Sequence, residues 1–292
     1  MNHLSHPSIS EELQKKFSED ILGEVLDTDA LREGFKELRK QYDAEMPDYT
    51  VDDATIAQFL RADTKGKKVN VGKSLKRLLD TVAFRKKIDI DRRLAENDAF
   101  PHQERYKKTR VRVWLGVDKE NRPLIVERVG KFSATSPGVK RPFSADEWVN
   151  LWAWDMEEHL TQMRKSSLAC GKAVHKFCMI GDLKGSGTYS GMKTLPLLKL
   201  LGKNVETFYP EIVGKVILIN AGTVFASLYK IAKRFLDPIT AAKIEVHSGV
   251  PKKVMENYFD VSIIPVEFGG TNEEVVVPPL VHWKKHEEHK KK

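Results

Sequence analysis

The chain has 292 residues, of which 41% are hydrophobic and 31% charged, and its formal net charge is +8 at pH 7. This composition is typical of a globular protein that can bury a sizeable core or enclose a cavity. No apolar run approaches the roughly eighteen residues that a membrane-spanning helix needs, which argues against a transmembrane protein. The basic balance favours polyanionic partners, either nucleic acid or an anionic membrane surface.

Two further features concern the compartment. The first residues, "MNHLSHPSISEEL", lack the basic and apolar regions of a secretory signal. Cys170 and Cys178 are the only cysteines, which fits a reducing compartment, and they lack the spacing of a metal site. We therefore expect a cytoplasmic protein that uses no metal and no cofactor.

Residues 8–98 have the periodicity of several amphipathic helices. In "LKRLLDTVAFRKK", the apolar positions recur three or four residues apart and basic residues fill the opposite face. Ser8 and Glu11 have the spacing of a capping box. The stretch "DTKGKKVNVGK" predicts a loop between two helices. We predict a small N-terminal helical bundle in residues 1–105.

The pattern changes near residue 109, where strand-forming residues begin to dominate. "RVRVWLGV" and "PLIVERVG" predict a hairpin around the turn "DKENRP". Ser144 and Glu147 offer a capping box ahead of a long helix. Strand-like and helix-like runs then alternate as far as "PKKVMENYF". We predict an α/β fold with a mostly parallel sheet in residues 106–275 and a basic tail in residues 276–292.

The stretch "CMIGDLKGSGTYSG" has the outline of a phosphate-binding loop. Its spacing fits neither common motif, because Met separates the last glycine from Lys193 and because Ser190 stands at the third glycine of the dinucleotide pattern. The sequence also offers no catalytic arrangement of serine, histidine or paired carboxylates. We expect no enzymatic activity, and we expect Asp182 and Lys184 to bond locally in a turn.

The stretch "TVFASLYKIAKRFL" predicts a helix that is apolar over most of its circumference. Such a helix is normally buried, but Lys230, Lys233 and Arg234 require that one side reaches water. Two interpretations stay open. The helix is either an ordinary core element or a lid over an apolar cavity, with a face that meets a bilayer when open.

A series of short motifs in a fixed order carries a family resemblance. They are Asp182-Leu183-Lys184-Gly185, Tyr209-Pro210-Glu211, Ile219-Asn220-Ala221, the run Phe235-Leu236-Asp237-Pro238 with Thr240 and Lys243-Ile244, and Phe268-Gly269-Gly270. Together with "AQFLRAD" and "DKENRPLIVERVG", these motifs make residues 50–275 resemble the CRAL-TRIO lipid-binding domain. Among its members, the chain is most similar to the secretory-pathway phosphatidylinositol-transfer proteins.

The resemblance implies a helical bundle followed by an α/β domain whose sheet is the floor of a deep apolar pocket. The helix at residues 223–235 corresponds to the family's mobile gate, so we expect Phe225 and Leu228 to line the pocket. The family also implies lipid binding and transfer without catalysis. Burial of acyl chains is worth about 0.8 kcal/mol per methylene, and a carrier has to offer an equivalent apolar surface.

The family recognises the inositol-phosphate head with a Glu after Tyr-Pro, a Lys after the Leu-Asp-Pro segment and a basic residue after the "FLRA" helix. Glu211 and Lys243 match the first two. Asp63 replaces the basic residue, and we expect Lys65, or a lysine at position 67 or 68, to substitute. An ordinary helix-start carboxylate and a surface cation stay open as structural alternatives for Glu211 and Lys243.

Family members that bind phosphatidylcholine surround its head with tyrosines and small hydroxyl residues. Five of the matching positions here are apolar: Trp114, Ile125, Met156, Phe177 and Met179. Only Tyr209 keeps its hydroxyl and remains a candidate head-group residue. Each polar group of a zwitterionic head that is left unsatisfied would cost about 1–3 kcal/mol. We predict poor phosphatidylcholine binding, and a second ligand that is less polar, such as a sterol, or no second ligand.

The resemblance thus predicts a monomeric phosphatidylinositol-transfer protein that associates peripherally with membranes, Golgi or endosomal ones being expected from the family. The alternative is a carrier or sensor of another hydrophobic lipid, such as a sterol. A sensor would present its lipid to a phosphoinositide kinase. A nucleic-acid partner is not expected, because the basic runs are not interleaved with aromatic residues.

Overall fold

The computed structural model describes residues 11–109, 111–128, 143–185, 200, 202–233 and 238–274. The chain divides into two compact units, each assembled from separate stretches. The first unit comprises Met1–Phe100, Trp152–Phe177 and Lys199–Gly214, and the second comprises Pro101–Leu151, Cys178–Leu198 and Lys215–Lys292. The Ser8 capping box, the glycines after Gly185, the motif Phe235-Leu236-Asp237 and the basic tail lie outside the described residues.

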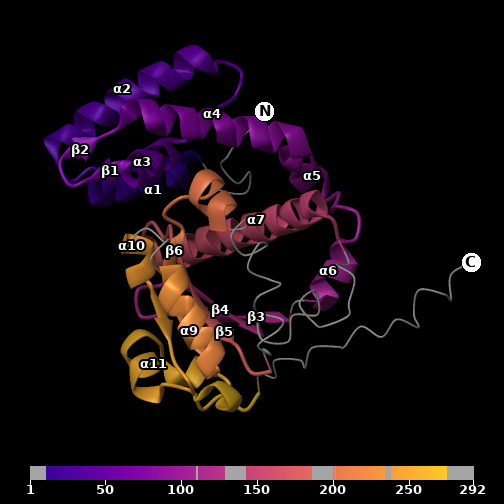
Figure 1. The fold of residues 1–292 in the computed structure, drawn as a ribbon. Coiled ribbons are helices and arrows are strands. Elements are labelled where there is room, and N and C mark those ends of the chain that lie inside the picture. The colour runs from indigo at the N-terminus through magenta and orange to yellow at the C-terminus, as the bar shows by residue number, and fades with distance from the viewer. Residues whose placement is uncertain are drawn as a thin grey trace, which may run out of the picture. The chain divides into compact units, whose positions relative to one another are not determined.

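The N-terminal part of the first unit is helical, as predicted. Its elements are α1 (Glu11–Val25), α2 (Asp29–Glu45), α3 (Asp53–Ala62), β1 (Thr64–Lys65), β2 (Lys68–Val69), α4 (Val71–Ile88) and α5 (Ile90–Glu96) (Figure 1). Thr28 caps α2 by accepting a hydrogen bond from the Leu31 amide at 3.3 Å. Asp52 caps α3 by accepting from the Thr55 amide at 2.7 Å. These side chains satisfy amides that a helix start leaves unbonded.

The stretch predicted as a loop between α3 and α4 is more ordered than that, so the prediction was wrong there. β1 and β2 pair as a short antiparallel hairpin around Gly66, whose φ is 59°. Asn70 then caps α4, because its side-chain oxygen accepts from the Lys73 amide at 3.0 Å. Gly72 suggests a break in the sequence, but a single glycine is tolerated in a helix.

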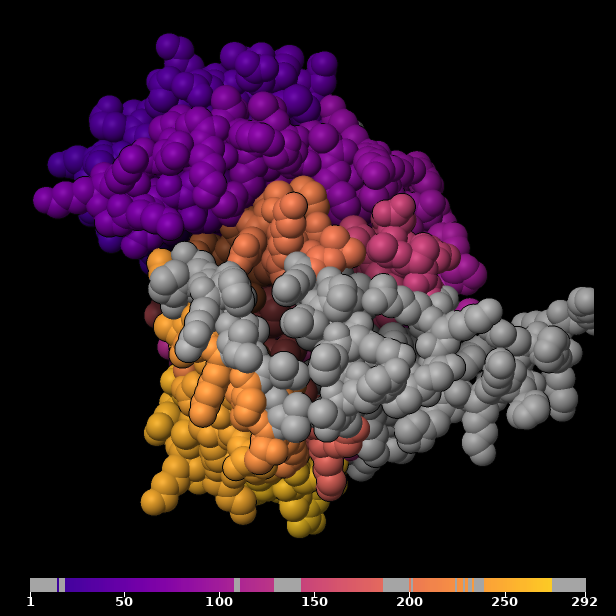
Figure 2. All heavy atoms as spheres, in the orientation of Figure 1, coloured from indigo at the N-terminus to yellow at the C-terminus, as the bar shows by residue number. Residues whose placement is uncertain are grey.

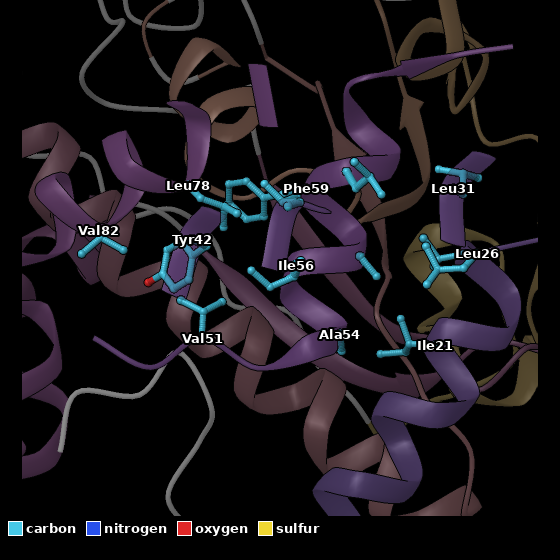
Figure 3. Packing of buried hydrophobic residues seen from close by; sticks show 14 of the residues in the cluster. Ile21, Leu26, Leu31, Tyr42, Val51, Ala54, Ile56, Phe59, Leu78 and Val82 are labelled. Carbon is cyan, nitrogen blue, oxygen red and sulfur yellow. The ribbon is translucent and has the colours of Figure 1, made fainter. Parts of the chain in front are cut away.

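Apolar side chains fill the space between these helices. Leu38, Ile56 and Leu60 are fully buried. Figure 3 shows Tyr42, Ile56 and Phe59 gathered among the other labelled residues of this core. In the space-filling view the helices form one continuous surface, coloured from indigo to purple (Figure 2). The apolar stripes of the sequence are therefore the packed faces of a helical bundle.

The second unit is built on a five-stranded sheet of order β3-β4-β5-β6-β7. The strands are β3 (Arg112–Val117), β4 (Pro123–Arg128), β5 (Phe177–Asp182), β6 (Val213–Ile219) and β7 (Ile244–Val246). β3 and β4 form the predicted antiparallel hairpin, whereas β4 with β5 and β6 with β7 are parallel. β5 and β6 are also parallel. The Phe177 amide donates to the Ile212 carbonyl where both strands begin, and the Leu183 amide donates to the Ile219 carbonyl where both end. The mostly parallel α/β sheet is confirmed.

The remaining helices follow the predicted alternation. They are α6 (Gln103–Thr109), α7 (Ala145–Cys170), α9 (Thr223–Ala232), α10 (Pro238–Ala242) and α11 (Lys252–Tyr258), with short 3-10 turns η3 (Val261–Ile263) and η4 (Val266–Phe268). The predicted capping box begins α7: the Ser144 amide donates to the Glu147 carboxylate at 2.7 Å, and the Glu147 amide donates to the Ser144 hydroxyl at 3.2 Å. None of the described helices is long and apolar enough to cross a lipid bilayer.

The two faces of the sheet are covered differently. One face, which includes Cys178 and Ile180 of β5, packs against Met255 of α11 and against Phe259, which follows that helix. The connections from β4 to β5, β5 to β6 and β6 to β7 all advance in one direction across the sheet. Connections between parallel strands are right-handed, which predicts that the connections containing α7 and α9 lie on one face of the sheet.

Candidate functional site

Three of the residues predicted to line the pocket lie in one row across the sheet. Trp114 of β3 pairs with Ile125 of β4, and Ile125 pairs in turn with Met179 of β5. Residues paired on neighbouring strands point to the same face. That face is the one away from α11, because the alternate residues of β4 and β5 pack against α11. Ile125 is fully buried and the other two are half-buried. The row therefore gives this face of the sheet an apolar surface, made of a tryptophan, an isoleucine and a methionine side chain.

Phe177 extends this surface along β5, because it lies two residues before Met179 and points to the same face. The His159 ring of α7 packs edge-on against the Phe177 ring, with centroids 4.4 Å apart. His159 is buried, and its Nδ1 lies 2.5 Å from the Asp155 carbonyl oxygen, which only accepts, so Nδ1 carries the hydrogen. Sequence reasoning missed His159. Its spacing of three residues from the buried Met156 on the same helix was the available signal.

Tyr209 is buried, and its hydroxyl has a partner in the first unit. The hydroxyl donates to Glu157 of α7 at 2.8 Å, and Arg85 of α4 donates to the same carboxylate oxygen at 2.5 Å. Burial and then the negative charge of Glu157 raise the pKa of Tyr209 well above its ordinary value. The Trp152 ring packs edge-on against the Tyr209 ring at 5.5 Å. Tyr209 thus anchors the Tyr-Pro-Glu turn that it begins.

Arg85 is the centre of a larger buried network. Its Nε and Nη2 atoms donate to one oxygen of Asp91 at 3.2 and 2.5 Å, and the Tyr49 hydroxyl donates to the other at 2.7 Å. Burial lowers the pKa of Arg85, but the charges of Glu157 and Asp91 outweigh it, so the pKa lies above its ordinary value. The network joins α4, α5, α7 and the Tyr-Pro-Glu turn through charge-assisted bonds.

Glu211, the predicted head-group carboxylate, follows that anchor by two residues. Its φ of 61° lies in the left-handed region, which a non-glycine residue occupies only when its surroundings hold it there. The backbone is bonded on both sides: the Tyr209 amide donates to Val205, and the Ile212 carbonyl accepts from Phe177, both at 2.9 Å. The half-buried Glu211 side chain therefore leaves a turn of fixed geometry.

Lys243, the predicted phosphate ligand, lies immediately before β7. Its amide donates to the Thr240 carbonyl at 3.1 Å, and its own carbonyl accepts from the Val216 amide at 2.9 Å. The side chain is half-buried. The backbone of Lys243 is thus fixed by the edge of the sheet, which limits where its ammonium group can reach.

The region of the expected third basic residue is arranged around Asp63. Asp63 is buried, and Lys73 and Arg77 of α4 both contact its Oδ1 atom at 2.7 Å. Lys65 lies exposed on the hairpin, opposite Lys68. Sequence reasoning did not consider Lys73 and Arg77, although their spacing of four places both on one side of a helix. An acidic residue here is therefore accompanied by two cations.

Several of the motifs meet at Asp182 in the second unit. Its Oδ1 accepts from the Asn220 amide group at 2.8 Å and from the Lys184 backbone amide at 3.0 Å, and its Oδ2 pairs with Arg128 at 3.2 Å. Arg128 in turn donates to both carboxylate oxygens of Glu267 at 2.7 Å. The bond to Lys184 confirms that Asp182 bonds locally. Asp182 and Asn220 belong to two of the family motifs, and their contacts show that these motifs help to hold the second unit together.

α9 has the two-sided character that its sequence predicts. Thr223, Ser227 and Lys230 are exposed, whereas Phe225 is half-buried and its ring lies parallel to that of Tyr229, with centroids 6.5 Å apart. The side chain of Leu228, also predicted to line the pocket, lies outside the described residues. One side of this helix thus reaches water and the other carries an aromatic pair.

Comparison with known proteins supports the resemblance read from the motifs. The family model of the CRAL/TRIO domain matches residues 107–270. A SEC14 cytosolic factor of Candida glabrata is 25% identical over 84% of this chain and 80% of the relative. One of Yarrowia lipolytica is 28% identical over 75% of this chain, which spans only 43% of that relative. The crystal structure of Sfh5 matches 86% of this chain and 90% of its own at 17% identity, with a TM-score of 0.63, which shows a shared fold.

Proposed function

Because the chain belongs to the CRAL/TRIO domain family, we propose that it is a lipid-transfer protein that carries phosphatidylinositol between membranes. The observation that carries the head-group assignment is the Tyr-Pro-Glu turn. There Glu211 follows a tyrosine whose hydroxyl is bonded to Glu157 and, through it, to Arg85. A recognition group is most selective when buried neighbours fix its position in advance.

Glu211 and Lys243 have complementary roles in this proposal. The Glu211 carboxylate accepts hydrogen bonds from inositol hydroxyls, and the Lys243 ammonium group pairs with the phosphodiester. Lys65 on the exposed hairpin adds positive charge next to the position where the family has a basic residue. Tyr209 supports the site by anchoring the turn. The chemistry needed is recognition, so no catalytic step is proposed.

The apolar row Trp114, Ile125 and Met179 supports the second half of the proposal, which is weak binding of phosphatidylcholine. The row gives the acyl chains of a lipid an apolar floor. A zwitterionic head placed on it would lose its water without gaining equivalent partners, at about 1–3 kcal/mol for each unsatisfied group. The floor thus favours lipid tails over a choline head.

We assign α9 the role of a gate. A carrier has to cover its lipid during transit and release it at a bilayer, so one element of the pocket wall has to move. The exposed Ser227 and Lys230 on one side and the half-buried aromatic pair on the other give α9 the two faces that such an element needs. The net charge of +8 favours approach to anionic membrane surfaces.

A second candidate function is transport or sensing of a less polar lipid such as a sterol. The same apolar row favours this function, because a sterol needs few polar contacts from the protein. In either case we propose a monomer that works in the cytoplasm and visits Golgi or endosomal membranes. A protein that senses lipid would present it to a phosphoinositide kinase.

Lipid extraction tests the proposal. The protein is incubated with liposomes that contain phosphatidylinositol, phosphatidylcholine and a sterol, then separated, and its bound lipid is identified by mass spectrometry. We expect phosphatidylinositol in clear excess over phosphatidylcholine. Absence of any phosphoinositide would overturn the head-group assignment, and recovery of the sterol instead would support the second candidate.

Matched variants test the assigned residues. We expect Lys243→Ala and Glu211→Ala each to lower phosphatidylinositol transfer at least tenfold, because each removes one charge-assisted contact worth about 1.5–3 kcal/mol. Lys253→Ala removes the same charge as Lys243→Ala from an exposed position on α11 and should leave transfer unchanged. Wild-type transfer by Lys243→Ala would contradict its assignment, provided that the variant unfolds at the same urea concentration.

A further inference from the structure

One buried polar group on α9 has no partner in the described part of the molecule. The hydroxyl oxygen of Tyr229 is buried, yet it makes no hydrogen bond to any residue that the structure describes. Burial also raises the pKa of this phenol. The hydroxyl thus stays protonated at neutral pH and keeps a hydrogen to donate. Because a buried hydroxyl without a partner costs free energy, it is an exception that needs an explanation.

Tyr229 is half-buried as a whole, and three fully buried tyrosines show how such a hydroxyl is normally satisfied. The Tyr42 hydroxyl donates to the Tyr49 carbonyl oxygen at 2.9 Å, and the Tyr49 hydroxyl donates to Asp91 at 2.7 Å. The Tyr209 hydroxyl donates to Glu157 at 2.8 Å. Those tyrosines belong to the packed interior of the first unit. Tyr229 lies on the helix that corresponds, by the family resemblance, to the mobile gate.

The position of Tyr229 on α9 sets the direction of its side chain. Ser227 and Lys230 occupy the exposed side of the helix. Tyr229 follows Phe225 by one turn on the other side, and the two rings lie within 5° of parallel. The hydroxyl is therefore carried on the inner, aromatic side of α9.

The topology of the sheet places the inner side of α9 toward the predicted pocket floor. The connection from β6 to β7 contains α9 and advances across the sheet in the same direction as the connection from β4 to β5, which contains α7. Because such connections are right-handed, α9 is assigned to the face that α7 contacts through His159 and Phe177, which is the face away from α11. Ile125 and Met179 belong to that same face. A connecting helix buries its apolar side against the sheet. Tyr229 thus supplies a hydrogen-bond donor opposite a floor made of apolar side chains.

We propose that the Tyr229 hydroxyl donates a hydrogen bond to an oxygen atom of the bound lipid. The protein would thereby select for lipids that carry an oxygen atom within reach of this hydroxyl. This inference rests on the lipid binding proposed above. The chemistry required is an uncharged oxygen acceptor surrounded by hydrocarbon. An acyl ester carbonyl of a glycerophospholipid supplies it, and so does the hydroxyl of a sterol.

The variant Tyr229→Phe removes the hydroxyl and nothing else. Protein freed of lipid is titrated with vesicles that contain phosphatidylinositol and, separately, with vesicles that contain a sterol, and the bound lipid is quantified. We expect binding of the matching lipid to weaken about fivefold, which is the effect of one hydrogen bond. We expect the melting temperature of the lipid-free variant to stay the same or rise, because a group without a partner has been removed.

An ether-linked phosphatidylinositol, which lacks the ester carbonyls, separates the two sources of the oxygen. If an ester carbonyl is the acceptor, the wild type prefers the ester lipid, and Tyr229→Phe binds ester and ether lipids equally. If a sterol hydroxyl is the acceptor, Tyr229→Phe weakens sterol binding alone. Either pattern supports the inference.

Tyr42→Phe is the matched control, because its hydroxyl is bonded within the protein. It should lower the melting temperature and leave lipid affinity unchanged. Equal affinity of wild type and Tyr229→Phe for every lipid overturns the inference and leaves lipid binding intact. A lower melting temperature of lipid-free Tyr229→Phe overturns it as well, because the hydroxyl would then be bonded inside the protein. Failure of the wild type to bind any lipid overturns the proposed function itself.

Discussion

Among the described residues, the Arg85 network of the first unit and the Asp182 network of the second differ in how fully they are removed from water. In the first unit, the Arg85 and Glu157 side chains are 3% and 9% exposed. In the second unit, Asp182 and Arg128 are 4% and 15% exposed, but Arg128 also pairs with Glu267, which is 43% exposed. The carboxylates that pair with Arg85 are largely buried, whereas one carboxylate of the second network is exposed. The cost of losing a charge should therefore follow burial rather than the number of bonds.

The largest effect is expected for Arg85→Ala. This change leaves Glu157 and Asp91 as buried carboxylates without their cation, and breaking a buried pair in this way costs about 3–5 kcal/mol. Urea unfolding followed by circular dichroism measures it. Arg92→Ala is the control, because Arg92 also binds several carboxylates but is 43% exposed, and it should change stability little. Equal losses for the two variants would show that burial does not set the cost.

A somewhat smaller loss, about 2–3 kcal/mol, is expected for Asp182→Ala. The change removes the acceptor of Asn220 and of the Lys184 amide, and it takes one of two carboxylates from Arg128. Glu267 still binds Arg128, so the cation is not left alone. The same urea titration, run beside Arg85→Ala, ranks the two networks. A loss larger than that of Arg85→Ala would reverse the comparison.

Tyr209→Phe should cost about 1.5 kcal/mol. It removes one hydrogen bond to a charged partner but leaves the Glu157 carboxylate bonded to Arg85. If the network also positions Glu211, the variant transfers phosphatidylinositol more slowly but transfers a lipid without an inositol head at the wild-type rate. The ratio of the two transfer rates checks this, since a purely structural loss would lower both rates together.

Much of the fold could be predicted from the sequence because its signals are local. The Ser144 and Glu147 capping box and the β3–β4 hairpin depend on residues a few positions apart, and both are present in the structure. The prediction failed at the hairpin before α4, where clustered lysines and glycine suggest a loop. Pairing of β1 with β2 and capping by Asn70 decide the structure there.

The apolar residues of the row could be named from the resemblance, but their alignment could not. Only the register of the three strands places Trp114, Ile125 and Met179 side by side. The Arg85 network could not be found from the resemblance. Arg85 and Glu157 are 72 residues apart, and Glu157 and Tyr209 are 52 apart. Single charged residues on a helix normally indicate its solvent face, so only the packed structure shows that these are buried.

The smallest loss of stability is expected for Glu267→Gln, which changes the solvent-exposed carboxylate of the second network. Glu267 is 43% exposed, so water screens its attraction to Arg128, and the loss should stay below about 1 kcal/mol. Added salt should shrink this loss further, because ions screen exposed pairs more than buried ones. The same salt series should leave the cost of Arg85→Ala nearly constant. Urea titrations at low and high salt compare the two variants directly, and a matching salt dependence would mean that both networks are equally open to water.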